Sequence, residues 1–307
     1  MINQFWTIKV ISMSRIISKR IKIAAFLLPS VIILSVFQIY PIFKSFLMAF
    51  YTKFDYLSGE VEEMGLSNFS NVLNDPDFIL AVKNTFVFVL LAVPIGITVA
   101  LIFALILDSN IRFKKFFQSV YFIPFITSTT AVSIMWKWML NSDYGVVNAF
   151  LLLFGIPKVS WLTNPNTTIP ILVAMSVWKG LGYKILIILA ALQGIDKRYI
   201  DAGKIDGAGS LRRVVHIKIP LLKPVILFLL TTSVIGSFKL FDEIFIMYHQ
   251  KPGPIQSGLT MVYYIIDKFY RHWEFAAASA AAFILFVIIL VFTLLGYLIV
   301  KKMDRDS

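Results

Sequence analysis

Three charged residues lie close together within one long apolar segment of the chain. Lys239, Asp242 and Glu243 are three and four positions apart, a spacing that places side chains on one face of a helix. A charge at the centre of a bilayer costs about 2.5–3.5 kcal/mol on insertion scales, so such residues usually face a partner or a water-filled cavity. The spacing therefore fits either a buried ion cluster that only positions the helix or a polar lining of a path through the protein.

A second group of polar and aromatic residues surrounds two glycines in another apolar segment. Glycine allows helices to approach closely or to unwind locally. Aromatic rings can stack on the apolar face of a sugar ring while polar side chains bind its hydroxyl groups. Packing in a core is the competing interpretation for each aromatic residue. The group consists of Trp178, Lys179, Tyr183 and Lys184, around Gly180 and Gly182.

The sequence contains no constellation of catalytic or metal-binding residues. His216, His249 and His272 are scattered without metal-ligand spacing. The chain has no cysteine, which excludes disulfides, thiol nucleophiles and iron–sulfur ligation. It also lacks the glycine-rich Gly-Lys-[Ser/Thr] loop that cradles nucleotide phosphates. We therefore expect no catalytic residue, no metal site and no cofactor in this chain itself.

Long apolar helices must position these residues. Of the 307 residues, 58% are hydrophobic and only 15% are charged, which argues against a soluble two-domain enzyme. Six apolar stretches have the ~20 residues needed to cross a bilayer, so we expect an all-α integral membrane protein, a six-helix transmembrane bundle. The first stretch exceeds the ~7–15 apolar residues of a signal peptide and is expected to remain as an anchor. The stretches are Ile23–Phe50, Ile79–Leu107, Phe116–Leu140, Ile169–Leu192, Leu221–Tyr248 and Trp273–Val300.

The basic residues beside these stretches predict the orientation of the bundle. Most of them lie in the N-terminal tail, around Arg112, between the fourth and fifth stretches, and at the C-terminus. We therefore expect both termini to be cytoplasmic, and the net charge of +12 to reflect topology rather than nucleic-acid binding. The expected organisation is a tail over residues 1–22, a six-span domain over 23–300 that contains a cytoplasmic loop at 194–220, and a tail over 301–307.

The first half of the cytoplasmic loop, residues 194–220, is typical of a short helix followed by a turn. Asp196 is expected to cap a helix over residues 197–205, because its side chain can accept from the free N–H groups of the first turn. Gly207 follows where the end of a helix needs a residue that adopts positive φ.

The second half of the loop predicts another short helix. Ser210 is expected to cap it, and it extends over residues 211–218 until Pro220 stops it. Apolar residues with basic flanks leave an exposed ridge on the loop. This ridge fits either a docking surface for a protein partner or an amphipathic segment on the membrane surface.

The loop resembles the signature of binding-protein-dependent ABC importer permeases, Glu-Ala-Ala-x3-Gly-x9-Ile-x-Leu-Pro. Asp201 replaces Glu with the same charge on a shorter arm, and Ile219 replaces Leu with similar bulk. Gly203 replaces Ala and weakens the first short helix by ~1 kcal/mol, which affects the fit to the partner. The matching positions are Asp201, Ala202, Gly203, Gly207, Ile217, Ile219 and Pro220.

The resemblance extends over about residues 23–300. Further runs look like the sugar-importer branch of this family in the order in which they occur. They include Leu27-Leu28-Pro29, Asp143-Tyr144-Gly145, Trp178-Lys179-Gly180-Leu181-Gly182-Tyr183, Phe238-Lys239-Leu240-Phe241-Asp242 and Phe275-Ala276-Ala277-Ala278.

The resemblance implies mechanical coupling to ATP hydrolysis in other subunits. In such permeases the cytoplasmic loop seats in a groove of the ATPase subunit, which binds ATP and Mg²⁺. The fifth span of sugar permeases contributes to the substrate cavity, which favours a substrate path through the polar residues described above. The residues implied to couple are Asp201, Ala202, Gly203, Asp206, Gly207, Ile217 and Pro220, and the residues expected along the substrate path are Trp178, Lys179, Tyr183, Lys239, Asp242 and Glu243.

The expected function is that of a non-catalytic permease subunit of an ABC importer for a sugar or oligosaccharide in the bacterial cytoplasmic (inner) membrane. The resemblance implies a second homologous permease, two ATPase subunits and an extracytoplasmic sugar-binding protein as partners. Glycerol-3-phosphate permeases share the same motifs, and an ion-coupled secondary transporter is the alternative from another class. The loops expected to dock the binding protein are Tyr51–Phe78, Asn141–Thr168 and His249–His272.

Overall fold

The computed structural model describes residues 22–54, 60–109 and 112–305. The chain forms two compact units, residues 1–68 and 69–307, and each is described by itself. Most of the tail expected over residues 1–22 lies outside the described residues, as do residues 306–307 of the expected C-terminal tail.

The first unit contains one long apolar helix, Lys22–Met48, followed by a β-hairpin. The helix includes a π-turn, η1 (Ser35–Ile39), and ends in α2 (Tyr40–Met48). Pro41 lacks an N–H and its ring crowds the preceding turn, so the wider turn directly before it accommodates the proline. Strands β1 (Tyr51–Phe54) and β2 (Val61–Met64) pair antiparallel.

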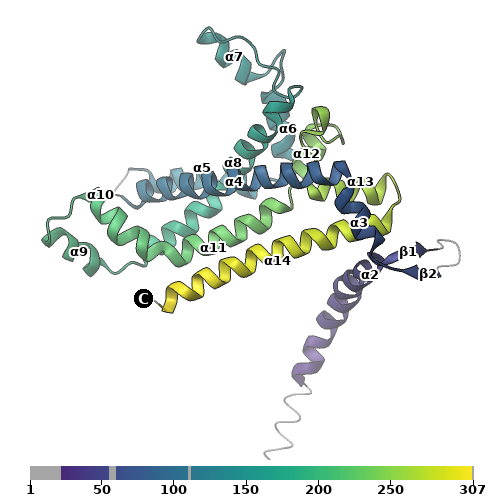
Figure 1. The fold of residues 1–307 in the computed structure, drawn as a ribbon. Coiled ribbons are helices and arrows are strands. Elements are labelled where there is room, and N and C mark those ends of the chain that lie inside the picture. Colours follow the sequence, from purple (N-terminus) through teal and green to yellow (C-terminus); the bar gives the residue numbers. More distant parts are fainter. Residues whose placement is uncertain (1–21, 55–59, 110–111, 306–307) are drawn as a thin grey trace, which may run out of the picture. The chain divides into compact units, whose positions relative to one another are not determined.

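The second unit is built around two long helices, α4 (Pro76–Asp108) and α8 (Pro165–Gln193) (Figure 1). Both begin in the same way: a side-chain oxygen, from Asp75 or Asn164, accepts from the backbone N–H two residues on, and proline fills the first helical position. Small residues on α4 let the two helices pack closely. Their shared core consists of Ala100, Ala104, Leu107, Leu181, Ile185, Ile188, Leu189 and Leu192, together with Leu222 and Leu229.

The third expected span, Phe116–Leu140, is not one continuous helix. It consists of α5 (Lys114–Ile126) and α6 (Thr129–Met139), which meet at an angle of 100°. Thr127 is extended, and the Ser128 hydroxyl accepts from the N–H of Ala131 to start a new helix. The predicted stretch covers both helices, but its apolar composition did not reveal the corner between them.

The fifth expected span, Leu221–Tyr248, has different boundaries at both ends. A continuous helix over Ser210–Phe238 comprises α10 (Ser210–Arg213), the π-turn η2 (Val214–Lys218) and α11 (Ile219–Phe238). The helix ends before Lys239, and α12 (Asp242–Met247) begins after the break. The three charged residues of this segment therefore lie at a helix break rather than along one helix.

The remaining helices complete the second unit. Helix α14 (Phe275–Arg305) begins two residues after the expected start and continues through residues 301–305 of the expected tail. In the described part of the chain, five helices are long and apolar enough to span a membrane, or six when α5 and α6 count as one span. The shorter helices are α3 (Ser67–Asn74), which begins at the boundary of the units, α7 (Val146–Leu153), α9 (Lys197–Ile205), the single turn η3 (Pro254–Gln256) and α13 (Met261–Tyr270).

Candidate functional site

The loop over residues 194–220 contains the first part of the site and begins with α9. The Asp196 carboxylate accepts from the backbone N–H of Arg198 at 2.9 Å and pairs with its guanidinium at 2.6 Å. These contacts from Arg198 lower the pKa of Asp196. The predicted cap and helix are confirmed.

The turn after α9 depends on a glycine, as predicted. Gly207 has φ 74°, a conformation that costs other residues roughly 1–2 kcal/mol. The backbone N–H of Ala208 donates to the carbonyl of Gly203 at 2.9 Å, and that of Gly207 donates to the carbonyl of Lys204 at 3.0 Å. No atom lies within 4 Å of a Cβ placed on Gly207, so its backbone angle, not its surroundings, requires glycine.

The loop folds back on itself through Gly203. This residue is buried, and a Cβ placed on it would lie 2.8 Å from Cδ1 of Ile217. The Arg213 guanidinium also donates to the carbonyl of Ala208. Helix α9 therefore lies directly against Ile217 at the position where the family signature has alanine.

Two expectations for the second half of the loop were wrong. Ser210 does not cap a helix; it is the first residue of α10, and Gly209 precedes it without a side-chain cap. Pro220 does not stop the helix, because the π-turn at residues 214–218 lies directly before it and α11 continues. Proline inside a helix lacks an N–H and its ring crowds the preceding turn, and the wider π-turn before Pro220 provides room for that ring.

The coupling residues expected from the signature separate into exposed and packed positions. Asp201, Ala202, Asp206 and Gly207 are exposed, whereas Gly203 is buried and Ile217 and Pro220 are partly buried. The exposed side also carries large apolar side chains, which form a surface that a partner can cover. These are Tyr199 at 58% exposure, Leu211 at 77% and Ile205 at 86%.

The second part of the site is a polar cavity of about 330 Å³ between the long helices. Helices α4, α8, α11 and α12 all contribute to it, and the break after Phe238 provides part of its wall. Most of its lining side chains carry a hydroxyl group or a charge. The lining residues are Phe88, Ser176, Gly180, Tyr183, Lys184, Thr232, Ser233, Gly236, Ser237, Lys239, Leu240, Asp242 and Glu243.

The structure brings four of the six expected substrate-path residues to this cavity. Tyr183, Lys239, Asp242 and Glu243 line it. Trp178 instead lines a separate, mostly apolar cavity of about 670 Å³ beside α5. Lys179 is absent from the lining of the polar cavity.

Of the two alternatives for Lys239, Asp242 and Glu243, an ion cluster on one helix face was wrong. Because α11 ends at Phe238, the three residues do not share a helix. Among the described residues, no ion pair joins Lys239 to either carboxylate. Their charged groups are thus available to the cavity.

Lys184 also lines the cavity but is missing from the expected substrate path. Its ammonium lies over Gly96 of α4, 2.8 Å from where a Cβ on that glycine would be. Residues 176, 180, 183 and 184 follow the spacing of one helix face, and this spacing was the signal that could have identified Lys184 and Ser176. Thr232, Ser233 and Ser237 also line the cavity, but residues 224–238 contain no charged residue that would indicate a polar site.

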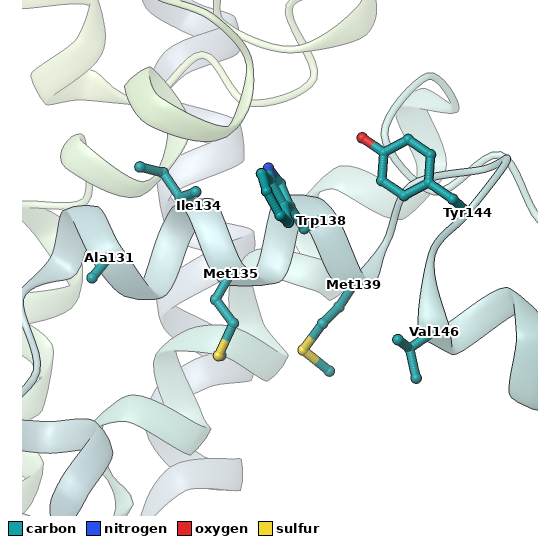
Figure 2. Close-up of a pocket in the computed structure, with 7 residues that line it drawn as sticks. All are labelled: Ala131, Ile134, Met135, Trp138, Met139, Tyr144 and Val146. Carbon is teal, nitrogen blue, oxygen red and sulfur yellow. The ribbon is translucent and has the colours of Figure 1, made fainter.

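A pocket of about 650 Å³ on α6 and the start of α7 is apolar (Figure 2). Polar groups there are restricted to the Trp138 indole and the Tyr144 hydroxyl. It therefore lacks the hydrogen-bonding groups that recognition of a hydrophilic ligand requires.

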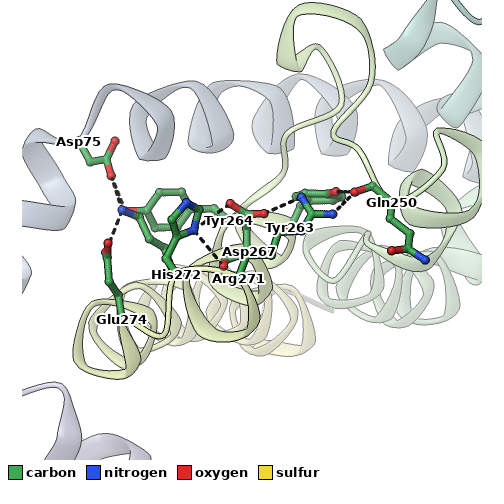
Figure 3. A network of polar contacts seen from close by, with 9 residues as sticks. Asp75, Gln250, Tyr263, Tyr264, Asp267, Arg271, His272 and Glu274 are labelled. Carbon is green, nitrogen blue, oxygen red and sulfur yellow. Dashed lines mark hydrogen bonds and ion pairs between the residues drawn. The ribbon is translucent and has the colours of Figure 1, made fainter.

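Helix α13 carries a network of polar contacts at the N-terminal end of α4 (Figure 3). The Tyr264 hydroxyl donates to Asp75 at 2.8 Å, and Lys268 pairs with Asp75 at 3.4 Å and with Glu274 at 2.9 Å. Arg271 pairs with Asp267 at 2.9 Å. The network fixes the segment between η3 and α14, which lies in one of the expected docking loops.

The chain belongs to the family of binding-protein-dependent transport system inner membrane components, whose sequence profile matches residues 85–305. The lactose transport system permease protein LacF of Rhizobium radiobacter is 38% identical, with 89% of this chain and 91% of LacF covered. The arabinooligosaccharides transport system permease protein AraP of Bacillus subtilis is 34% identical, with 91% and 88% covered. These matches confirm the resemblance.

The fold is also that of a solved ABC transporter chain. A bacterial ABC transporter involved in the import of the acidic polysaccharide alginate contains a chain with a TM-score of 0.84 and 24% sequence identity, with 94% of this chain and 98% of that chain covered. The expected fold class, a helical membrane bundle of the ABC importer permease kind, is confirmed. The chain is a multi-pass inner membrane component of a binding-protein-dependent transport system.

Proposed function

We propose that this chain is the permease subunit of an ATP-driven importer whose substrate is a neutral sugar or oligosaccharide. The observation that carries this proposal is the composition of the polar cavity. Two lysines, two carboxylates and several hydroxyls line it, and such groups donate to and accept from sugar hydroxyls. Relatives named for lactose and arabinooligosaccharide transport support the same substrate class.

The charges of the cavity favour a sugar over glycerol 3-phosphate, for which relatives are also named. Lys184 and Lys239 could attract a phosphate, but Asp242 and Glu243 line the same cavity. Like charges repel strongly in a site with low dielectric constant. A neutral polyhydroxyl substrate uses all four groups without this repulsion.

The exposed face of the loop over residues 194–220 supports coupling to ATPase subunits. We propose that it seats in a groove of an ATPase subunit, with Asp201, Ala202, Asp206 and Gly207 at the contact. Gly203, Ile217 and Pro220 hold the loop in shape. ATP and Mg²⁺ bind in the ATPase subunits, and their closure moves the loop and changes the access to the cavity.

The complete importer is proposed to contain a second homologous permease, two ATPase subunits and an extracytoplasmic sugar-binding protein. The loop over residues 194–220 faces the cytoplasm, and so do both termini. The C-terminal end of α14 lies at the same end of the second unit as α9, in agreement with this orientation (Figure 1). A periplasmic binding protein in a solved complex of the alginate transporter supports the last partner.

The binding protein is proposed to dock on the loops of the opposite side. These loops contain the β1–β2 hairpin, α7, and the segment of η3 and α13. The polar network on α13 gives that segment the fixed shape that a docking surface needs.

Uptake in a strain that lacks the gene and is complemented with it tests the proposed function. Labelled oligosaccharides and glycerol 3-phosphate are supplied with and without ATP depletion, at fixed membrane potential. We expect ATP-dependent uptake of a sugar. Uptake of glycerol 3-phosphate alone would reject the substrate class, and uptake indifferent to ATP would point to a secondary transporter.

Gly207→Val in the same strain tests the coupling role of the loop. Valine is strained at φ 74°, so we expect loss of transport and of ATPase association while membrane insertion is unchanged. Gly209→Ala is the matched control, because Gly209 has φ −61° and no atom near its Cβ position. Normal transport by Gly207→Val would contradict the coupling role.

A further inference from the structure

We propose that the ion pair between Asp108 and Lys218 is the link that passes movement of the loop over residues 194–220 to helix α4. The inference rests on the proposed coupling of that loop to an ATPase. It assigns a positioning role to two residues outside the exposed contact surface.

The geometry of this pair sets it apart from the other ion pairs of the loop. Lys218 Nζ lies 2.6 Å from Asp108 Oδ2, and the two side chains are only 22% and 18% exposed. The remaining pairs, of Asp196 and of Asp201, join neighbours within three positions and are more exposed. Exposed pairs between neighbouring residues contribute little to the free energy of folding. A partly buried pair between residues 110 positions apart fixes two elements relative to each other.

The link continues directly from the packed part of the loop. Helix α9 lies on Ile217 through Gly203, and Lys218 is the next residue along the chain. Asp108 is the last residue of α4. Beside the pair, Leu107 and Leu222 are buried in the same core cluster, so a polar and an apolar contact join α4 to α11 at this end.

Both joined helices line the polar cavity. Helix α4 contributes Phe88, and α11 contributes its hydroxyl groups and leads into the break at Lys239. Movement of α9 therefore reaches two walls of the cavity together when the pair is intact. Without it, only the apolar contact of Leu107 and Leu222 joins the two helices at this end, so movement of α11 is passed to α4 less completely.

The test uses the assembled importer in proteoliposomes with its binding protein, and measures sugar import and ATP hydrolysis in parallel. The variants are Asp108→Asn, Lys218→Gln, the conservative Asp108→Glu, and the exchange Asp108→Lys with Lys218→Asp. Lys223→Gln is the matched control, since Lys223 is exposed on the same helix and forms no ion pair among the described residues.

We expect each neutralising variant to import about tenfold less sugar per ATP hydrolysed, which corresponds to the loss of one charge-assisted contact. Asp108→Glu and the charge exchange should restore most of the import, and Lys223→Gln should leave it unchanged. If Asp108→Asn or Lys218→Gln prevents assembly of the importer while the charge exchange assembles and imports sugar, this result also supports the proposed role of the ion pair.

Two outcomes would overturn the inference. One is import at the level of the wild type by Asp108→Asn, and the other is failure of the charge exchange to restore import. The proposed function fails separately, if the wild-type importer shows no ATP-dependent sugar import at all.

Discussion

At the scale of single residues, the packing around Gly203 decides which side chains fit at this position. A Cβ at this position would meet only the far end of the Ile217 side chain at 2.8 Å, with Arg213 carbons at 3.5 Å. A terminal methyl can rotate away, and alanine favours the helix by about 1 kcal/mol over glycine. The two effects nearly cancel, so the glycine is compatible with the alanine of the family signature.

We therefore expect Gly203→Ala to change the stability by less than about 1 kcal/mol and to preserve transport. Gly203→Val should cost about 1–3 kcal/mol, because overpacking moves α9 away from Ile217. Thermal unfolding of the purified chain and sugar uptake measure both effects. If this packing explanation holds, adding Ile217→Val to Gly203→Val must recover part of the lost stability, because it removes the contacting Cδ1.

At the scale of elements, two glycines on α8 have different roles. A Cβ on Gly182 would collide with backbone atoms of α5, the Tyr121 carbonyl and Phe122 Cα, the latter at 2.8 Å. A Cβ on Gly180 would meet only the Lys184 ammonium at 3.6 Å. Close approach of helices therefore depends on Gly182, while Gly180 leaves space at the polar cavity.

Gly182→Ala should destabilise the protein by about 1–3 kcal/mol or more, because the backbone of α5 must shift as a unit. Gly180→Ala should be neutral or slightly stabilising, since alanine is the better helix former. Thermal unfolding in detergent compares the two variants. Equal unfolding temperatures would show that α5 does not pack on Gly182 as described.

Local signals in the sequence predicted the elements that depend on local contacts. Asp196 caps α9 and Gly207 adopts positive φ because each effect involves only a few neighbouring residues. The apolar stretches likewise predicted the long helices. The fold class and the family followed from these signals together with the loop signature.

The helix breaks could not be predicted in the same way. The corner lies at a run of hydroxyl residues, Thr127–Thr130, and the break after Phe238 lies beside Lys239 and Asp242. Membrane helices also carry such residues without a break, so their presence does not predict one. Lys184 belongs to the cavity because α4 offers space at Gly96, which is a tertiary effect. The sequence predicts that Pro220 ends a helix, because no sequence signal marks the π-turn that accommodates it.

At the scale of the whole second unit, α4 is held by charged contacts at both ends. Asp108 pairs with Lys218 at one end, and Asp75 binds Tyr264 and Lys268 at the other. The helix between them packs on α8 and α11 along the shared core. A helix fixed in this way can carry movement from the loop over residues 194–220 to the segment with the polar network (Figure 3).

The network at Asp75 gives a pH dependence with a defined sign. Burial acts to raise the pKa of Asp75, but the hydrogen bonds from Tyr264 and the Asp77 N–H, with the charge of Lys268, together lower it. Burial acts to lower the pKa of Lys268, but its contacts with Glu274 and Asp75 outweigh this effect and raise the pKa. Burial and the hydrogen bond to Asp75 raise the pKa of Tyr264. The stabilisation of the fold by Asp75 is thus present above about pH 4 and is lost at lower pH. The stabilisation by Lys268 and Tyr264 is present below about pH 10 and is lost at higher pH.

We expect the unfolding temperature to be highest between these two pH limits. In Asp75→Asn, the unfolding temperature should decline less steeply in acid than in the wild type. At pH 7 the variant should unfold about 2–4 °C lower, as a loss of about 1 kcal/mol produces in a domain of this size. Asp77→Asn is the matched control, because Asp77 is exposed and its backbone N–H, not its side chain, contacts Asp75. Scanning calorimetry across pH measures both variants. If the unfolding temperature of Asp75→Asn declined in acid as steeply as that of the wild type, this network would not hold the N-terminal end of α4.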